Sequence, residues 1–340
     1  MTQPAAFNES ATERLQKFLA ETNGENFGGI APLTPDASTR EYFRIGWANK
    51  TAIACVYSEP FVTSDQSYLD VTALFRAAEL PVAEVLAADG ALGVIVHEDF
   101  GDRVLRSVLE AASEAERENL IDDAVRLIAR IQAATAKAFE IDSIAARLAF
   151  DEEKLGWELN FFTAHYFGSL RGEVLLDTDA AALRKELAEV AQELAARPHV
   201  LCHRDFHAAN LMLDAANRLV IIDHQDARMG AASYDLVSLL LDRVSAPPAP
   251  AWIREKISLL LAERQNLNLA AIDADEFAGE FELMTVQRCL KAIGTFSFQT
   301  AVRGKKGYTQ FINPMFLIVL QTAERLDRFP VLQKIIRERI

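Results

Sequence analysis

The sequence predicts an α+β fold with a small β-rich N-terminal lobe and a larger, mainly helical C-terminal lobe. Three observations lead to this prediction. The chain has 340 residues, which suits two lobes better than one minimal domain. Strand-like runs gather before about residue 96, and helical periodicity dominates after Gly101. Half of the residues are hydrophobic and a quarter are charged, as in ordinary globular proteins.

The first lobe is expected to begin with a helix and continue as strands around a second helix. Ser10 and Glu13 fit a capping box, and an apolar stripe at helical spacing follows until Gly24. The strand-like segments are 42–45, 52–56 and 93–96, and the second helix is expected at 67–78. Strands around one helix predict a small α+β lobe.

The second lobe is expected to be helical with one interruption. The predicted helices cover 115–138, 151–168, 179–196, 252–265, 276–298 and 314–327. The interruption holds three strand-like pieces, 200–202, 211–213 and 219–222, with polar residues between and after them. We therefore expect an N-lobe at 1–98, a hinge at 99–102 and a C-lobe at 103–340, with functional groups on loops of a rigid scaffold.

Charge and cysteine content limit the binding partners and the cellular compartment that the sequence allows. The net charge of -14 argues against nucleic-acid binding, since a phosphate backbone is repelled by an acidic surface. The three cysteines include no CxxC pair, which suits buried thiols in a reducing compartment. There is no signal-peptide pattern and no run of about 18 apolar residues, so we expect a cytoplasmic protein without a membrane span. The sequence does not give the oligomeric state.

One segment carries the chemistry. Asp205 lies five residues before Asn210, and Asp223 lies thirteen residues after Asn210, at the end of a strand. Phosphoryl transfer needs a carboxylate that orients the attacking hydroxyl and accepts its proton, which suits Asp205. It also needs oxygen ligands that hold Mg²⁺ against a triphosphate, which suits Asn210 and Asp223. The pattern predicts an ATP- and Mg²⁺-dependent transferase of phosphoryl groups.

Two histidines allow a different interpretation. His203 and His207 are four residues apart and could share a helix face, as zinc ligands do. The segment is more loop-like than helical, however, and no E-x-x-H pairing occurs. We expect His203 to be a buried, hydrogen-bonded residue that supports the loop.

The segment His203-Arg204-Asp205-x4-Asn210 resembles the catalytic loop of the protein-kinase-like superfamily. The second motif is Asp223-His224-Gln225 instead of D-F-G, which is typical of the aminoglycoside phosphotransferase and choline kinase branch. Tyr234-Asp235-Leu236 also resembles that branch, where the aspartate typically braces the catalytic loop. The resemblance therefore implies a protein-kinase-like fold and a structural role for Asp235.

The nucleotide side lacks both a P-loop and a Rossmann fingerprint. We expect the phosphate-facing turn at 36–40, where Ser38 and Arg40 would contact ATP. The lysine that the superfamily carries on its third strand is missing, and Arg44 is the hypothesised substitute. The hinge is expected to bind adenine through the Glu98 carbonyl and the Phe100 N–H.

Within this branch the sequence most resembles the bacterial anomeric kinases for N-acetylmuramate and N-acetylglucosamine, which act in peptidoglycan recycling. The likeness includes Asp36-Ala37-Ser38 and the segment 287–296. It implies transfer of the γ-phosphoryl group of ATP to the C1 hydroxyl of an amino sugar. Candidate sugar-binding residues are Glu158, Asn160, Asp226 and Arg288, of which Arg288 could also receive a lactyl carboxylate.

Two alternatives remain open. The chain could be another enzyme of the same fold that phosphorylates an aminoglycoside, choline or homoserine. It could also be a non-catalytic pseudokinase that binds nucleotide, since the third-strand lysine is absent. The intact Asp205, Asn210 and Asp223 argue against the pseudokinase.

Overall fold

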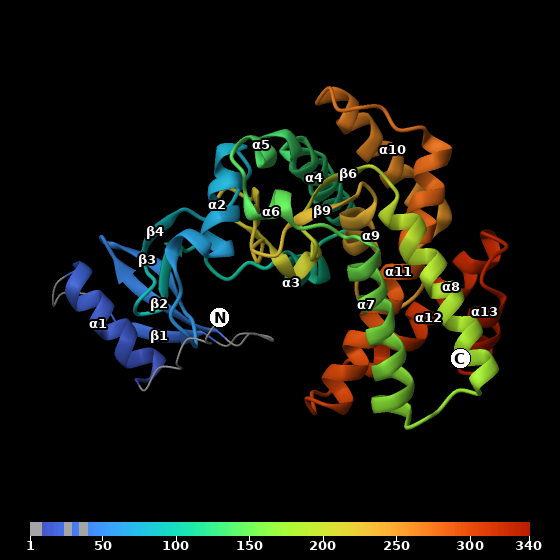
Figure 1. Cartoon of the computed structure of the whole chain (residues 1–340). Helices are drawn as coiled ribbons and strands as arrows, with labels where there is room; N and C mark the ends of the chain where they lie inside the picture. Colours follow the sequence, from blue (N-terminus) through green and yellow to red (C-terminus); the bar gives the residue numbers. More distant parts are fainter. Residues whose placement is uncertain (1–8, 24–28, 34–39) are drawn as a thin grey trace. The chain divides into compact units, whose positions relative to one another are not determined.

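The computed structural model describes residues 9–23, 29–33 and 40–340 (Figure 1). The chain forms two compact units. Unit 1 consists of residues 1–110 and 209–226, and unit 2 consists of residues 111–208 and 227–340. The hairpin at 209–226 therefore groups with the β-rich part of the chain. The predicted lobe boundaries at 98 and 103 stay a prediction.

Unit 1 is built on a five-stranded antiparallel sheet with the strand order β1-β2-β3-β5-β4. Its strands and helices are β1 (Ile30–Leu33), β2 (Glu41–Trp47), β3 (Lys50–Val56), β4 (Val85–Asp89), β5 (Val94–Glu98), α1 (Ala11–Asn23), α2 (Ser67–Ala77) and α3 (Leu105–Ala111), with a 3₁₀ turn at Thr63–Asp65. Strands β3 and β5 pair antiparallel, although α2 and β4 lie between them in the chain.

Helix α1 begins as the sequence predicts and covers one face of the sheet (Figure 1). The Glu13 N–H donates to the Ser10 hydroxyl, and the Glu13 carboxylate accepts from the Ser10 N–H at 2.8 Å, which completes the capping box. Leu15, Phe18 and Leu19 point from this helix into a core shared with the sheet. Burial of this apolar stripe stabilises the small unit, because each fully buried side chain contributes about 1.5–3 kcal/mol.

A second hairpin completes unit 1. Strands β7 (Leu211–Leu213) and β8 (Leu219–Ile221) pair antiparallel, with Leu211 opposite Ile221. The hairpin is anchored by backbone hydrogen bonds from Leu213 N–H to Arg103 O at 2.9 Å and from Ile221 N–H to Pro81 O at 2.7 Å. The register places the residues before β7 beside the residues after β8.

Unit 2 is mainly helical, with one two-stranded antiparallel ribbon, β6–β9. Its elements are α4 (Glu114–Ala133), α5 (Thr135–Glu140), α6 (Ile144–Arg147), α7 (Glu152–Thr163), a π-helix (Ala164–Arg171), α8 (Asp177–Ala195), β6 (His199–Cys202), β9 (Arg228–Ala231), α9 (Tyr234–Leu241), α10 (Pro250–Asn266), α11 (Ala274–Ala301), α12 (Ile312–Arg325) and α13 (Pro330–Arg337). A short 3₁₀ turn lies at Thr309–Phe311, and another, Ala208–Asn210, spans the point where the chain passes from unit 2 to unit 1.

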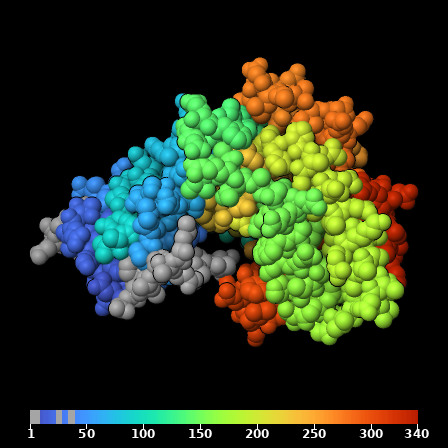
Figure 2. All heavy atoms as spheres, in the orientation of Figure 1, coloured from blue at the N-terminus to red at the C-terminus, as the bar shows by residue number. Residues whose placement is uncertain are grey.

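Helix α11 is the central element of unit 2 and packs against α7, α8, α9 and α12. Its approach to α7 is close because residue 294 is glycine. A Cβ atom there would lie 2.7 Å from the Phe162 Cα and 2.9 Å from the Phe162 N. The segment from α7 through the π-helix to α8 forms a continuous surface on the face of unit 2 shown in Figure 2, coloured green to yellow-green.

The predicted fold class is confirmed: a small antiparallel sheet is followed by a mainly helical remainder. Some boundaries were wrong. The helix predicted at 115–138 breaks into α4 and α5 at Ala134, and the helix predicted at 151–168 ends in a π-helix that continues to Arg171. All three cysteines are buried free thiols. In the part of the chain that the structure describes, no helix is long and apolar enough to span a bilayer.

Candidate active site

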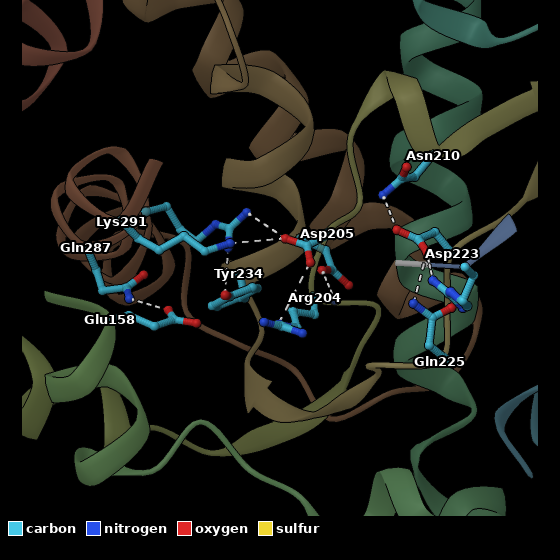
Figure 3. A network of polar contacts seen from close by, with 12 residues as sticks. Glu158, Arg204, Asp205, Asn210, Asp223, Gln225, Tyr234, Gln287 and Lys291 are labelled. Atoms are coloured by element: carbon cyan, nitrogen blue, oxygen red, sulfur yellow. Dashed lines mark hydrogen bonds and ion pairs between the residues drawn. The ribbon is translucent and has the colours of Figure 1, made fainter. Parts of the chain in front are cut away.

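Asp205 lies in unit 2, in the loop that follows β6, and three bases surround its carboxylate (Figure 3). The Lys291 Nζ is 3.2 Å from the Asp205 Oδ1, and the Arg288 Nη2 is 3.8 Å from the same oxygen. The Arg204 Nε is 3.8 Å from the Asp205 Oδ2. Lys291 and Arg288 both come from α11, so one helix supplies two of the three positive charges.

This arrangement keeps the Asp205 carboxyl ionised. Burial by itself raises the pKa of Asp205, but the charges of Lys291, Arg204 and Arg288 outweigh it and hold the pKa well below its usual range. The Asp205 side chain is still 28% exposed. The loop therefore presents an accessible carboxylate that can accept a hydrogen bond at neutral pH, although as a base it is weak.

The backbone of this loop is strained, and Asp235 holds it through two hydrogen bonds. Arg204 has φ of +86°, a conformation that costs a non-glycine residue of order 1–3 kcal/mol. The buried Asp235 carboxylate accepts from the His203 N–H at 2.6 Å and from the Arg204 N–H at 3.0 Å. His203 is fully buried. Asp235 therefore holds the backbone of the loop that carries Asp205, and the structural roles of His203 and Asp235 stay predictions.

Asn210 and Asp223 lie in unit 1, at the open end of the β7–β8 hairpin (Figure 3). The Ile222 N–H donates to the Asn210 carbonyl at 3.1 Å, and the Asn210 Nδ2 is 3.5 Å from the Asp223 Oδ2. Asp223 has φ of +60°, which aspartate tolerates better than most residues. The hairpin register therefore brings the two predicted metal ligands together.

The donor set at this point fits a magnesium ion. One carboxylate and one amide are hard oxygen ligands, and Mg²⁺ is typically held by one or two such protein groups plus phosphate oxygens. The Asp223 side chain is 43% exposed, so its oxygens are accessible. Among the described residues, no three His, Cys, Asp or Glu side chains gather into a metal-binding group.

The two arginines predicted near the phosphates have different surroundings in unit 1. Arg40 Nη2 is 3.4 Å from Asp223 Oδ1, and the Arg40 guanidinium lies over the rings of Tyr42 and Tyr57, 5.8 Å and 5.7 Å from their centroids. Arg40 therefore lies beside Asp223, a predicted metal ligand.

Arg44, the hypothesised substitute for the lysine, instead binds two acids. Its Nε is 2.7 Å from Asp99, whose side chain is only 4% exposed, and its Nη2 is 2.8 Å from Asp102. These contacts favour Arg40 over Arg44 as the cation that faces phosphate, and they give Arg44 a role in tying β2 to the segment after β5.

The remaining nucleotide-side predictions are Glu98, Phe100 and Ser38. Glu98 ends β5, and its N–H donates to the Glu84 carbonyl at 2.9 Å. The Glu98 carbonyl lies 3.0 Å from the His97 Nδ1, and its second lone pair can accept from another donor. Phe100 follows within the same segment. Ser38 lies outside the described residues.

The four predicted sugar-binding residues have different surroundings within their own units. Glu158 is buried on α7, where it accepts from the Gln287 Nε2 at 2.8 Å (Figure 3). Asn160 is exposed, two residues further along the same helix and so on a different side. Arg288 donates to the Tyr234 hydroxyl at 2.7 Å and covers the Tyr234 ring. Asp226 lies in unit 1, in the turn after Asp223.

Sequence reasoning missed two residues of this site, Lys291 and Gln287. Lys291 contacts Asp205, and Gln287 contacts Glu158. Both are on α11 and lie four residues apart, so they share one side of that helix, and Lys291 is also one turn from Arg288. That spacing was the available signal, but it does not say which face of α11 meets the catalytic loop.

With this geometry established, comparison with known proteins identifies the family. The phosphotransferase enzyme family matches residues 29–269, well over half of the chain. The chain belongs to this family. The predicted enzyme class, a phosphotransferase with a hydroxyl acceptor, is thereby confirmed.

Individual relatives agree with this assignment. An N-acetylmuramate/N-acetylglucosamine kinase from Neisseria meningitidis serogroup B is 31% identical over 318 residues, covering 92% of this chain and 90% of the relative. Two solved structures share the fold. Choline kinase LicA from Streptococcus pneumoniae has a TM-score of 0.58 at 12% identity, covering 92% of this chain and 98% of that chain. The ADP-bound aminoglycoside phosphotransferase APH(2'')-Ib has a TM-score of 0.55 at 16% identity, and the match covers 95% of this chain and 100% of that chain.

Proposed function

We propose that this phosphotransferase is an ATP- and Mg²⁺-dependent kinase that phosphorylates the anomeric hydroxyl of N-acetylmuramate and N-acetylglucosamine. The relative that is 31% identical over most of the chain bears that name, which supports a sugar kinase. The observation that carries the proposal is the Asp205 carboxylate, which is accessible, braced by Asp235 and kept ionised by three bases.

In the proposed reaction, the sugar hydroxyl gives its proton to the Asp205 carboxylate as its oxygen bonds to the γ-phosphorus of ATP. The bond between that phosphorus and the β–γ bridging oxygen breaks, ADP leaves, and Asp205 later releases the proton to solvent. Asn210 and Asp223 would hold Mg²⁺, which offsets the negative charge of the phosphates. Arg40 would contact a phosphate oxygen beside the metal ligand.

The weak base fits an acidic acceptor. A carboxylate whose pKa is held low by Lys291, Arg204 and Arg288 accepts a proton reluctantly. A hemiacetal hydroxyl such as the sugar C1 hydroxyl is more acidic than an ordinary alcohol and asks less of the base. The same positive charges would repel a cationic acceptor, so they favour an amino sugar with an acetylated nitrogen over an aminoglycoside or choline.

The proposal requires Asp205 and the pair Asn210–Asp223 to act on one phosphoryl group, although they belong to different compact units. The sequence limits their separation. Four residues lie between Asp205 and Asn210, so the chain makes five steps from one to the other, and a fully extended chain spans at most about 3.6 Å per step, or about 18 Å here. This upper limit on the distance between Asp205 and Asn210 is compatible with the proposal.

The test is ³¹P NMR of the products formed from ATP and Mg²⁺ with N-acetylmuramate, N-acetylglucosamine or kanamycin. We expect a sugar 1-phosphate from both amino sugars and no product from kanamycin. Asp205→Asn should abolish turnover while leaving nucleotide binding intact. Phosphorylated kanamycin with inert amino sugars would contradict the proposed acceptor, and nucleotide binding without any turnover by the wild type would favour a pseudokinase.

A further inference from the structure

A lysine and a tryptophan one turn apart on α7 form an exposed edge of unit 2. The Lys154 Nζ lies 4.3 Å from the Trp157 ring centroid, a cation–π contact. The Trp157 side chain is 55% exposed, although a large aromatic side chain is usually more deeply covered. An exposed indole face of this kind can stack on the apolar C–H face of a pyranose ring.

Lys154 carries a charge that the protein itself leaves uncompensated at close range. In the described part of the chain Lys154 forms no ion pair. Burial lowers the pKa of Lys154, Glu158 partly offsets this, and the charges of Arg204, Arg228 and Lys291 lower it further. Those interactions also place the Lys154 ammonium near the bases that surround Asp205.

Positive charges gather around Asp205, although the chain as a whole is negatively charged. The chain has a net charge of -14, yet the Asp205 neighbourhood gathers the bases Lys154, Arg204, Arg228, Arg288 and Lys291 around two carboxylates, Asp205 and Glu158. Lys291, Arg204 and Arg288 each lie within 4.0 Å of Asp205. Lys154 stands apart from this set, beside Trp157.

We propose that Lys154 and Trp157 form an acceptor subsite in which Trp157 stacks on the sugar ring and Lys154 binds a carboxylate carried by the acceptor. The inference rests on the proposed function, since it names the part of the sugar kinase that distinguishes an acidic from a neutral amino sugar. A strongly hydrated ammonium on a flexible stem suits a carboxylate that is itself attached through a flexible ether.

Arg288, the sequence-based candidate for binding a lactyl carboxylate, is already engaged. Its guanidinium donates to the Tyr234 hydroxyl, covers the Tyr234 ring and pairs with Asp205, and its side chain is only 10% exposed. Releasing Arg288 from these contacts would disturb Asp205, the proposed catalytic base. Lys154 can reach an acceptor carboxylate without breaking any ion pair of its own.

Three ligands separate charge from size: N-acetylglucosamine, N-acetylmuramate, and the methyl ester of N-acetylmuramate, which keeps the lactyl ether without its charge. The variants are Lys154→Met, Lys154→Arg and, as a matched control, Lys137→Met, a partly exposed lysine of unit 2 that pairs with Glu140. The readout is kcat/KM for each acceptor at saturating ATP and Mg²⁺.

We expect Lys154→Met to lower kcat/KM for N-acetylmuramate about tenfold or more, the effect of losing a charge-assisted hydrogen bond. The neutral sugar and the ester should be unaffected, Lys154→Arg should recover much of the loss, and Lys137→Met should match the wild type. Trp157→Ala should lower kcat/KM for all three acceptors by a similar factor. An equal loss for all three in Lys154→Met, or no loss for the acid, would overturn the carboxylate assignment, and an unchanged Trp157→Ala would overturn the stacking assignment.

If the wild type phosphorylates none of the three, the proposed function fails, and calorimetric binding of the same ligands then tests the subsite alone. Tighter binding of the acid than of its ester by the wild type, lost in Lys154→Met, would support it. Equal binding of acid and ester would overturn it.

Discussion

Replacing Lys291 by methionine should move the acid limb of the pH–rate profile to higher pH. The substitution keeps an unbranched apolar stem of similar length and removes one charge. Lys291 is 3.2 Å from the Asp205 carboxylate, closer than Arg288 or Arg204, which are both at 3.8 Å. Lys291 therefore contributes the largest single share of the charge that keeps Asp205 ionised.

The size of the shift follows from this distance. Coulomb's law with an effective dielectric constant of about 20 gives ~5 kcal/mol for two unit charges at 3.2 Å. Water screens part of this, since the Asp205 side chain is 28% exposed, and the two arginines remain in the variant. Carboxylates beside a single cation usually show shifts of about one to three pKa units, so we expect about one to two units here.

The direction in which the acid limb moves follows from the loss of the positive charge of Lys291. The cations hold the pKa of Asp205 below its usual range, so the carboxylate form persists to low pH in the wild type. Without Lys291 the pKa rises, and protonation removes the base at a higher pH as the solution is acidified. The acid limb of kcat/KM, which reports the free enzyme, should therefore move upward by the same one to two units, roughly.

The assay is a profile of kcat/KM for N-acetylglucosamine against pH for the wild type, Lys291→Met and Lys291→Arg. Lys291→Arg retains the charge and should keep the limb near its wild-type position. An acid limb that stays in place, or moves to lower pH, would refute the electrostatic reasoning. A uniform loss at every pH would instead mean that Lys291 acts on the phosphoryl group without tuning the base.

Three further predictions concern the supports of the site. Asp235→Asn should lower both kcat and the free energy of unfolding, the latter by about 1–3 kcal/mol. The reason is that an amide NH₂ would face one of the two buried backbone N–H donors that Asp235 now accepts from. Urea unfolding and steady-state kinetics check this. Arg40→Ala should weaken binding of a fluorescent ATP analogue about tenfold through loss of a charge-assisted contact, whereas Arg44→Ala should chiefly lower the thermal midpoint; the reverse pattern would restore Arg44 as the phosphate ligand. Gly294→Ala should destabilise the protein by about 1–3 kcal/mol, since its Cβ would overlap the Phe162 backbone, and an unchanged urea midpoint would contradict that packing.

The sequence alone determined the fold class and the spacing of the predicted catalytic motif, because both depend on local patterns. Apolar periodicity distinguishes strands from helices, and the capping box at Ser10 and Glu13 marks a helix start without reference to the rest of the chain. The spacing of Asn210 and Asp223 around a hairpin likewise predicts their proximity, since the register of paired strands follows from chain connectivity.

Only the tertiary structure decided which cations serve which carboxylates. By sequence either Arg40, just before β2, or Arg44, within β2, could supply the missing positive charge, but Arg44 contacts Asp99 and Asp102 while Arg40 contacts Asp223. Lys291 lies 86 residues from Asp205 and contacts it because α11 packs beside the catalytic loop. Such long-range pairings depend on how whole elements pack against one another, and no local periodicity or motif in the chain encodes that choice.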